Sequence, residues 1–250
     1  HGDDRRQRQM CIRDRDGTAD EDISINAGSG TLAVGAIGTG TADGINTVAL
    51  TSSTSITLSG GISTSDAATN TVTLTGPVII SGAVDIDTDT DGTDGTVEFT
   101  STIVGDGAAG TTDNLTIDSG GSSITFGGTI GVAAPIAGFN VNQDGGTVAL
   151  SIPQIGTAGG SAGTSGTTNI GTTSSATVAM SAASYKFGGE TNIKASSAST
   201  GITFSGANPK VDTANANITL TGPVVISNGE LDINSACLLY TSPSPRDAHK

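Results

Sequence analysis

Residues 51–81 read TSSTSITLSGGISTSDAATNTVTLTGPVIIS, and residues 197–227 read SASTGITFSGANPKVDTANANITLTGPVVIS. The two stretches align without a gap at an offset of 146 residues and agree at 16 of 31 positions. The match extends over residues 51–87 and 197–233, with a one-residue insertion that brings AVDID opposite ELDIN. A long internal repeat of this kind predicts that the fold is built by stacking similar units.

A shorter motif recurs inside the repeat. It consists of a β-branched residue, any residue, Leu or Phe, small residues, and often Ile or Val. The apolar positions alternate with Thr or Ser and are bounded by turn residues, a pattern typical of half-buried strands. The copies are ITLSGGI (56–62), VTLTGPV (72–78), VEFTSTI (97–103), ITFGGTI (124–130), ITFSGAN (202–208) and ITLTGPV (218–224), with degenerate copies VALSIPQ (148–154) and YKFGGET (185–191).

These short strands recur at close intervals over most of the chain and indicate an all-β fold with essentially no helix. We expect a right-handed parallel β-solenoid of about nine irregular rungs, each stabilised by its neighbours. Aromatic residues make up 3% of the chain, which suits the narrow core of a solenoid better than the alternative, tandem β-sandwich domains with buried aromatic centres.

Three further features carry local expectations. The stretch 156–175 is almost entirely Gly, Ser, Thr and Ala, which predicts a loose insertion between rungs. Pro77 and Pro223 occupy equivalent positions in LTGPV and predict a corner between strands. Asp66 and Asp212 are equivalent across the repeat and are expected to lie in turns.

The two ends of the chain differ in composition from its centre. Residues 1–15 contain five of the six Arg, and residues 237–250 contain the sixth. RRQRQMCIRDR (5–15) and CLLYTSPSPRD (237–247) resemble the translation of a sequencing-library adapter. The expected organisation is therefore an adapter-derived artefact at 1–15, a solenoid repeat region at 16–236 and a second artefact at 237–250.

Charge and hydropathy exclude two classes of function. The net charge of the chain is -14, and Lys186, Lys194 and Lys210 are the only basic residues between 16 and 236. Nucleic-acid backbones are bound through Lys and Arg, so we expect no nucleic-acid partner. No apolar run reaches the roughly 18 residues of a membrane helix, so we expect no membrane span in this segment.

The segment DIDTDTDGTDGTVE (85–98) is the strongest candidate for a metal site. Its Asp residues alternate along the chain and precede a Gly and a Glu at spacings that resemble a calcium-binding loop, although strands flank it in place of helices. The sequence predicts a calcium-clamped turn, with a solvated acidic loop as the alternative. The candidate ligands are Asp87, Asp89, Asp91, Thr93 and Glu98.

Residues 16–236 lack several of the side chains that commonly act in catalysis. This segment contains no His, Cys or Arg, so it lacks the residues of a familiar triad or a thiol nucleophile. Paired carboxylates can hydrolyse glycosides, but no pair stands out. We therefore expect no enzymatic activity and no cofactor other than calcium.

The runs ITLTGPVVISNGELDIN (218–234) and VEFTSTIVGDGAAGTTDNLTIDSGGSSITFGGTIGVAAPIAGFNV (97–141) resemble the repeat regions of very large bacterial surface proteins. These include filamentous-haemagglutinin-like adhesins and autotransporter passenger domains. The resemblance implies an extracellular, non-catalytic structural or adhesive stalk at the bacterial cell surface. Its expected partners are glycans or proteins of host or neighbouring cells. The alternatives are a virus tail-fibre or tailspike segment and a surface-layer protein.

Overall fold

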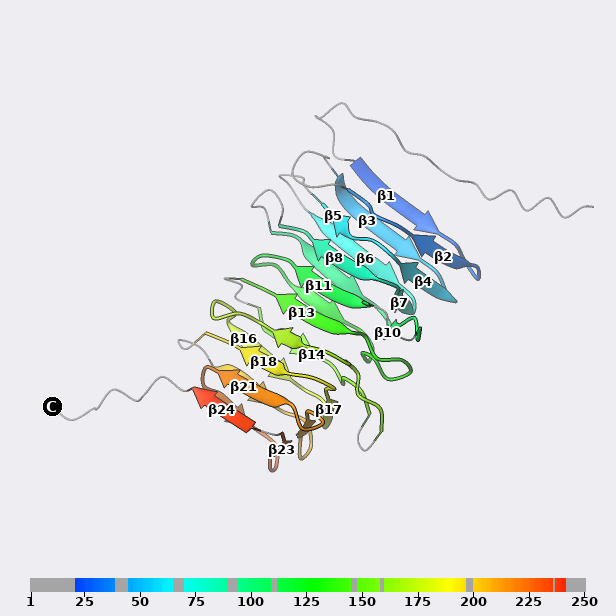
Figure 1. Cartoon of the computed structure of the whole chain (residues 1–250). Helices are drawn as coiled ribbons and strands as arrows, with labels where there is room; N and C mark the ends of the chain where they lie inside the picture. The colour runs from blue at the N-terminus through cyan, green and yellow to red at the C-terminus, as the bar shows by residue number, and fades with distance from the viewer. Residues whose placement is uncertain are drawn as a thin grey trace, which may run out of the picture.

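The computed structural model describes residues 21–38, 45–64, 70–89, 94–108, 112–144, 148–157, 160–196, 200–235 and 237–241. Over these ranges the chain forms 24 β-strands and no helix, and the strands stack along one axis from β1 to β24 (Figure 1). Every strand pair among them is parallel. The fold is therefore the expected parallel β-solenoid, and the alternative of tandem sandwiches, whose sheets are antiparallel, is wrong.

The first face of the solenoid consists of nine strands, in a five-stranded sheet followed by a four-stranded sheet. Contacts between β12 and β14 join the two sheets. The strands are β1 (Glu21–Asn26), β3 (Ile45–Thr51), β6 (Thr71–Thr75), β9 (Thr96–Phe99), β12 (Ile124–Phe126), β14 (Leu150–Ile152), β16 (Thr177–Met180), β19 (Gly201–Phe204) and β22 (Val224–Ile226).

The second face begins and ends with regular strands, and single-residue bridges connect them in the middle. Ile103, Ile130, Ile155 and Tyr185 form this chain of parallel bridges. The strands are β2 (Thr31–Val34), β4 (Ser55–Leu58), β7 (Val78–Ile80), β10 (Ile103–Gly105), β17 (Ser184–Lys186), β20 (Lys210–Asp212) and β23 (Asp232–Asn234).

The third face is one eight-stranded sheet. Its strands are β5 (Ile62–Ser63), β8 (Ala83–Asp87), β11 (Asn114–Asp118), β13 (Gly138–Asn142), β15 (Thr168–Ile170), β18 (Thr191–Lys194), β21 (Asn217–Thr221) and β24 (Cys237–Thr241). The chain visits the three faces in order, so β1 to β22 make eight full turns and β23 and β24 continue a ninth. The prediction of about nine rungs is confirmed.

The core follows from the alternation of apolar and polar residues in each strand. In β6, Val72 and Leu74 are fully buried, whereas Thr71 and Thr73 are half-buried and Thr75 is exposed. Parallel pairing in register then places apolar residues directly above one another from turn to turn, as for Leu50 and Leu74. The result is a continuous apolar column inside the three faces.

The few aromatic residues between positions 16 and 236 lie in this column or pack against it. Phe99 stacks on Phe126 with ring centroids 5.6 Å apart, and Phe126 meets Phe139 edge-on at 6.0 Å. Tyr185 stacks on Phe187 at 6.5 Å. Such contacts add to the stabilisation from buried area alone. Three narrow faces thus enclose a core filled mainly by branched aliphatic side chains, with only a few aromatic rings among them.

The predicted corners at Pro77 and Pro223 are confirmed. Each proline follows a glycine with positive φ, +125° at Gly76 and +121° at Gly222. A Cβ on Gly76 would lie 1.8 Å from the carbonyl oxygen of Ser52, so only glycine fits beneath the neighbouring turn. The carbonyl of Pro77 accepts a hydrogen bond from the amide of Ile56 at 2.8 Å.

All eight copies of the short motif contribute a strand, but one copy does not make a whole rung. Each turn contains three short strands, one on each face. The copies that begin at Ile56 and Val72 lie on the second face and on the first face of the following turn. From one of these copies to the next the chain therefore moves on by two faces, which is less than a complete turn.

The prediction of a loose insertion at 156–175 is wrong. This segment forms part of the stack, because it contains β15 and a bridge from Thr164 to Ile136 and Phe187. Thr164 and Thr168 are fully buried and share a hydrogen bond of 3.0 Å between their hydroxyls. Hydroxyl pairing lets a segment poor in large apolar residues occupy the interior.

The two copies of the long repeat occupy different faces. Strand β6 lies on the first face and its counterpart β21 on the third, while β7 on the second face corresponds to β22 on the first. One repeat therefore advances the chain by five turns and two further faces. The three faces present the same environment, apolar inside and polar outside, so the same sequence folds on any of them.

Strand β24 lies in the segment that the sequence analysis assigns to an adapter. It pairs in register with β21 from Cys237 to Thr241. The segment CLLYT has high β-propensity, and β21 would otherwise present an open edge. This pairing follows from composition and does not test the origin of residues 237–250.

The repeat provides a matched test of core packing. Ile80 and its counterpart Ile226 differ because β10 stacks on β7, whereas no described strand stacks on β22 beyond β19; Ile80 is fully buried and Ile226 is 47% exposed. We expect Ile80→Ala to lower the free energy of unfolding by about 2–5 kcal/mol and Ile226→Ala by less than about 1 kcal/mol. Urea denaturation measures both, and equal losses would contradict the placement of the repeat.

Tyr185 provides a test of the buried polar contacts. Its hydroxyl accepts a hydrogen bond from the amide of Ala182 at 2.7 Å and donates one to the carbonyl of Ile152 at 3.1 Å. Because Tyr185→Phe leaves both backbone groups without this partner, we expect a loss of about 1–3 kcal/mol in the free energy of unfolding. Unchanged urea stability would show that the hydroxyl does not connect these turns.

Candidate functional site: a polar groove on the third face

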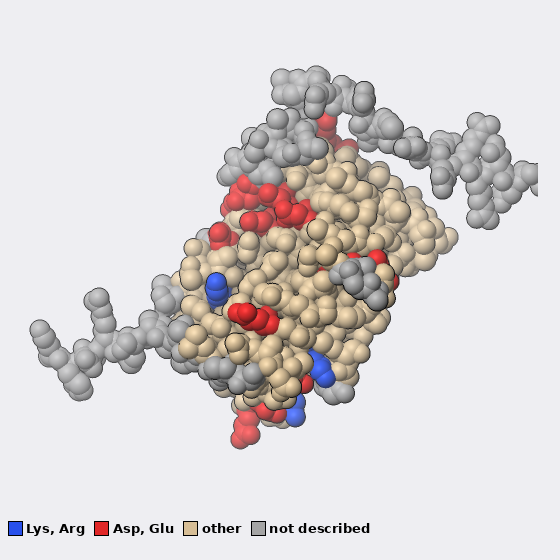
Figure 2. Space-filling model, in the orientation of Figure 1, with Lys and Arg blue, Asp and Glu red and all other residues tan. Residues whose placement is uncertain are grey.

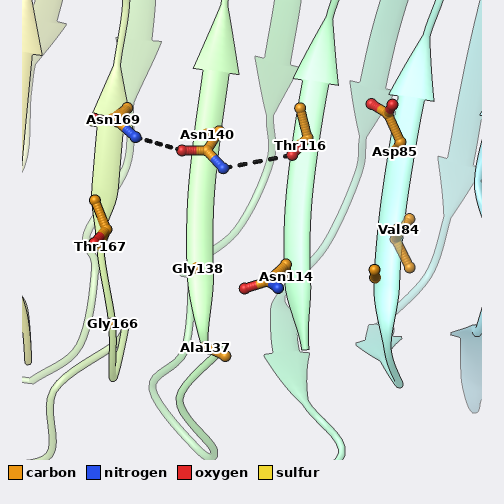
Figure 3. Close-up of a pocket in the computed structure, with 11 residues that line it drawn as sticks. Val84, Asp85, Asn114, Thr116, Ala137, Gly138, Asn140, Gly166, Thr167 and Asn169 are labelled. Carbon is orange, nitrogen blue, oxygen red and sulfur yellow. Dashed lines mark hydrogen bonds between the residues drawn. The ribbon is translucent and has the colours of Figure 1, made fainter. Parts of the chain in front are cut away.

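A groove of about 630 Å³ lies on the outer surface of the third face. It runs across four successive strands, β8, β11, β13 and β15 (Figure 3). A row of polar side chains lines one side, and the other side combines Ala and Gly with the side chains of Asn114 and Thr167. The lining residues are Ala83, Val84, Asp85, Asn114, Thr116, Ala137, Gly138, Asn140, Gly166, Thr167 and Asn169.

Parallel register builds the polar side of the groove. Asp85 pairs with Thr116, Thr116 with Asn140, and Asn140 with Asn169, so these residues form one row along the solenoid axis. The row continues to Asn192 on β18, outside the groove. Adjacent positions in such a row lie about 4.8 Å apart, which is the spacing between paired strands.

Side-chain hydrogen bonds connect this row. Asn140 donates from Nδ2 to the hydroxyl of Thr116 at 3.5 Å, and Asn169 donates from Nδ2 to Oδ1 of Asn140 at 2.6 Å (Figure 3). Asn192 in turn donates to Oδ1 of Asn169 at 3.0 Å. The bonds run in one direction along the axis and hold each amide in a defined orientation.

On the other side, glycines leave room for neighbouring groups to lie close to the backbone. A Cβ on Gly138 would lie 2.6 Å from Oδ1 of Asn114, and a Cβ on Gly166 would lie 2.6 Å from the carbonyl oxygen of Ala137. Larger residues at these positions would therefore displace their neighbours. Glycine at both positions keeps this side low, with the side chain of Asn114 lying beside Gly138.

Carboxylates give one end of the groove a negative charge. Asp85 lies in the groove, and Asp87 pairs in register with Asp118 on the next strand. Partial desolvation raises the pKa of Asp85, and the charges of Asp87 and then Asp118 raise it further. Figure 2 shows one large group of Asp and Glu at the upper left of the visible surface and smaller groups elsewhere, while most of that surface has neither acidic nor basic residues.

The structure describes three of the five predicted calcium ligands, Asp87, Asp89 and Glu98. Asp87 ends β8 on the third face, and its Oδ1 accepts a hydrogen bond from the amide of Asp89 at 2.9 Å. Glu98 lies on β9 of the first face, in register with Thr73 and Thr125, and is exposed. Glu98 therefore continues the alternating pattern of a strand, as the motif at 97–103 predicts.

Asp91 and Thr93, the remaining predicted ligands, lie outside the described residues, as does Asp66. Within the described ranges, no group of three or more His, Cys, Asp and Glu residues is arranged to hold a metal ion. Calcium binding by the turn at 85–98 stays a prediction. The same ranges contain no helix that is long and apolar enough to cross a membrane.

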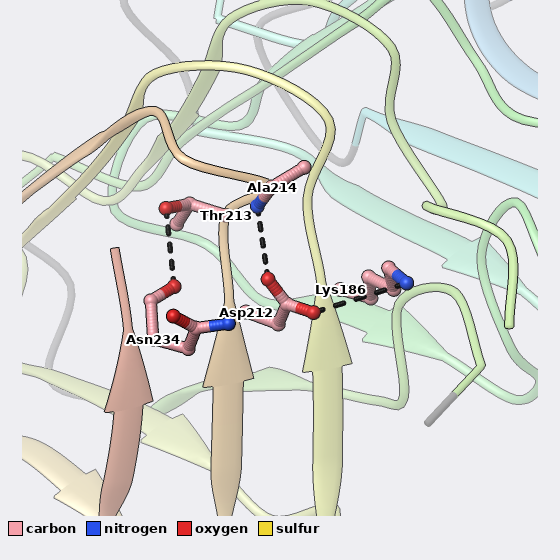
Figure 4. Close-up of polar contacts among 5 residues, drawn as sticks. All are labelled: Lys186, Asp212, Thr213, Ala214 and Asn234. Atoms are coloured by element: carbon pink, nitrogen blue, oxygen red, sulfur yellow. Dashed lines mark hydrogen bonds and ion pairs between the residues drawn. The ribbon is translucent and has the colours of Figure 1, made fainter. Parts of the chain in front are cut away.

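A second, smaller hollow of about 190 Å³ lies on the second face over β17, β20 and β23. Lys186 forms an ion pair with Asp212 at 3.8 Å (Figure 4), and Lys210 forms one with Asp232 at 3.4 Å. Asp212 also accepts a hydrogen bond from the amide of Ala214 at 2.9 Å, at the end of its strand, as the predicted turn position requires.

The sequence analysis missed the amide row. Asn140, Asn169 and Asn192 lie on successive turns and are far apart in the sequence, so no short window contains two of them. The signal that could have revealed them is the triplet Thr-Asn-Ile, which occurs at 168–170 and again at 191–193. Aligning these triplets in register would have predicted a ladder of amides on one face.

Comparison of the chain with protein-family models, curated proteins and solved structures finds no match. The fold and the groove therefore carry the functional argument, together with the repeat in the sequence.

Replacing Asp85 by Asn tests the electrostatics of the groove. Because the folded state raises the pKa of this carboxyl, the ionised form opposes folding. The carboxyl's favourable contribution is complete below its unfolded pKa of about 3.9 and is lost as the pH rises through the higher folded value. We expect Asp85→Asn to raise the melting temperature at pH 7 by about 1–2 °C, with no difference at pH 3.

Glu230→Gln is the matched control, because it removes one negative charge from an exposed position away from Asp87 and Asp118. Its melting temperature at pH 7 should equal that of the parent chain. A rise as large as that of Asp85→Asn would assign the effect to net charge instead of to the carboxylates beside the groove. Thermal scans followed by circular dichroism at both pH values make the comparison.

Proposed function

We propose that this chain is a segment of a non-catalytic structural and adhesive stalk in a large secreted or cell-surface repeat protein of bacteria. The observation that carries the proposal is the continuous stack of parallel turns around one apolar column. Each turn is stabilised by the turns on either side, so a stack can be lengthened by repetition without changing its cross-section. A rigid stalk requires this property.

Dimensions and surface support the same proposal. Eight turn-to-turn steps of about 4.8 Å extend the described stack over about 38 Å, and the outward residues of every face are mostly Thr, Ser, Asn and Asp. Adhesive contacts would therefore lie along the sides of the stalk. Residues 16–236 contain no His, Cys or Arg, which is the reason for proposing a role without catalysis.

A long sequencing read across the parent locus tests the proposal. We expect further copies of the long repeat, a secretion segment and a C-terminal anchor or outer-membrane barrel in the same open reading frame. Neighbouring viral structural genes would instead favour a tail-fibre or tailspike segment. A catalytic domain in the same frame would make the solenoid a spacer within an enzyme, contrary to the proposal.

Sedimentation of the whole chain supplies an independent test. The closed core of a single chain predicts an elongated monomer, because the apolar column is enclosed by three faces of the same polypeptide. The measurement is the mass and frictional ratio from analytical ultracentrifugation. A stable trimer would contradict the stalk proposal in favour of a tail fibre, and ordered two-dimensional arrays in electron micrographs would favour a surface layer.

A further inference from the structure

We propose that the groove on the third face binds an uncharged oligosaccharide, with the sugar chain lying along the solenoid axis across β8, β11, β13 and β15. The inference rests on the proposed adhesive function and assigns the contact to one site on the stalk. Four features of the groove support it: the amide row, its charge, the open floor and the contrast with the second hollow.

The amide row suits ligands that carry hydroxyl groups. A primary amide has two N–H donors and an oxygen with two lone pairs. In the described contacts Asn140 uses one donor toward Thr116 and accepts one bond from Asn169. One donor and one acceptor site on this amide therefore remain to face the groove. Sugar hydroxyls both donate and accept, so they complement a surface that alternates the two functions at each strand.

The charge of the groove determines which sugars fit. Asp85 is the charged residue of the lining, and Asp87 and Asp118 lie in the adjacent outward row. Among the described residues, no Lys or Arg lines the groove to balance an anion. Polysaccharides with carboxylate or sulfate groups would meet like charge at this end, whereas an uncharged chain can accept from the amides and donate to the Asp85 carboxylate.

The floor of the groove accommodates the less polar faces of sugar rings. Ala83, Ala137, Gly138 and Gly166 present methyl groups and backbone to the groove, and the side chains of Asn114 and Thr167 lie among them. Because a Cβ on Gly138 or Gly166 would collide with a neighbour, the packing of these strands requires the small residues at these two positions. Figure 3 shows this side next to the row of Asp85, Thr116, Asn140 and Asn169.

The second hollow contains the repeat counterpart of a groove residue in a different setting. Asp232 is the repeat counterpart of Asp85, but it pairs with Lys210 at 3.4 Å. Asp212 and Lys186 form the neighbouring pair at 3.8 Å. Carboxylates on the second face are thus partnered by ammonium groups of adjacent strands, whereas the described residues that line the third-face groove include no Lys or Arg.

Isothermal titration calorimetry on the whole chain tests the proposal with defined probes. The uncharged probes are cellohexaose, laminarihexaose and chitohexaose, and the anionic probe is hexagalacturonate. We expect at least one uncharged hexasaccharide to bind with a Kd on the order of 1 mM or tighter, and hexagalacturonate to bind at least about tenfold more weakly. No measurable binding of any uncharged probe would overturn the proposal.

Two asparagine variants locate the binding. Asn140→Ala removes an amide from the centre of the groove, and we expect the Kd to rise about tenfold or more. Asn192→Ala removes an equivalent amide from the same hydrogen-bonded row outside the groove, and the Kd should stay within about twofold. Equal losses in both variants would place binding elsewhere. Circular dichroism confirms that each variant keeps its strands.

The outcome is separable from the test of the proposed function. A chain that sediments as an elongated monomer and belongs to a repeat-rich locus, yet binds none of the uncharged probes, overturns the groove assignment and leaves the stalk proposal standing. Binding of hexagalacturonate as tight as that of the uncharged probes would also overturn the assignment, because it would show that the carboxylates do not select the ligand.

Discussion

In-register parallel pairing is the constraint on which the rest of the structure depends. Each strand places its residues directly above those of the previous turn, so the residue that points inward at one level stands on the inward residue of the next, as Val48, Val72 and Val97 do. Apolar residues thereby form a column without a large aromatic centre. The same geometry aligns the outward residues into rows, and the groove is a consequence of those rows.

The class of fold could be predicted from the sequence because short strands and corners carry local signals. Gly76-Pro77 marks a corner by steric necessity, and the alternation in β6 marks a strand by hydropathy alone. The arrangement of three strands in each turn was harder to predict, because the short motif does not occur in every strand. Strand β15, for example, lies in a segment of Gly, Ser and Thr in which buried hydroxyls replace apolar contacts. Local composition cannot reveal that Thr164 and Thr168 meet inside the stack.

The candidate site was less predictable for a related reason. The acidic run at 85–98 predicts a metal site because its carboxylates are close together in sequence. Asp87, however, ends a strand of the third face, whereas Glu98 lies on a strand of the first face. The amides of Asn140 and Asn169 are far apart in sequence, and register alone joins them. In a solenoid, residues that lie one turn apart in sequence are neighbours along the axis. A surface site is therefore formed by residues of several turns, and a search of short sequence windows does not find it.

This separation has a consequence for how such a surface can acquire a ligand. Inward residues are held by the column, because a change there disturbs the turns above and below, whereas an outward position such as Asn140 contacts mainly its own row. Rows can therefore change one residue at a time while the stack is preserved. A stalk built on this principle separates its mechanical role, carried by the core, from recognition, carried by whichever outward row combines polar groups with an open floor.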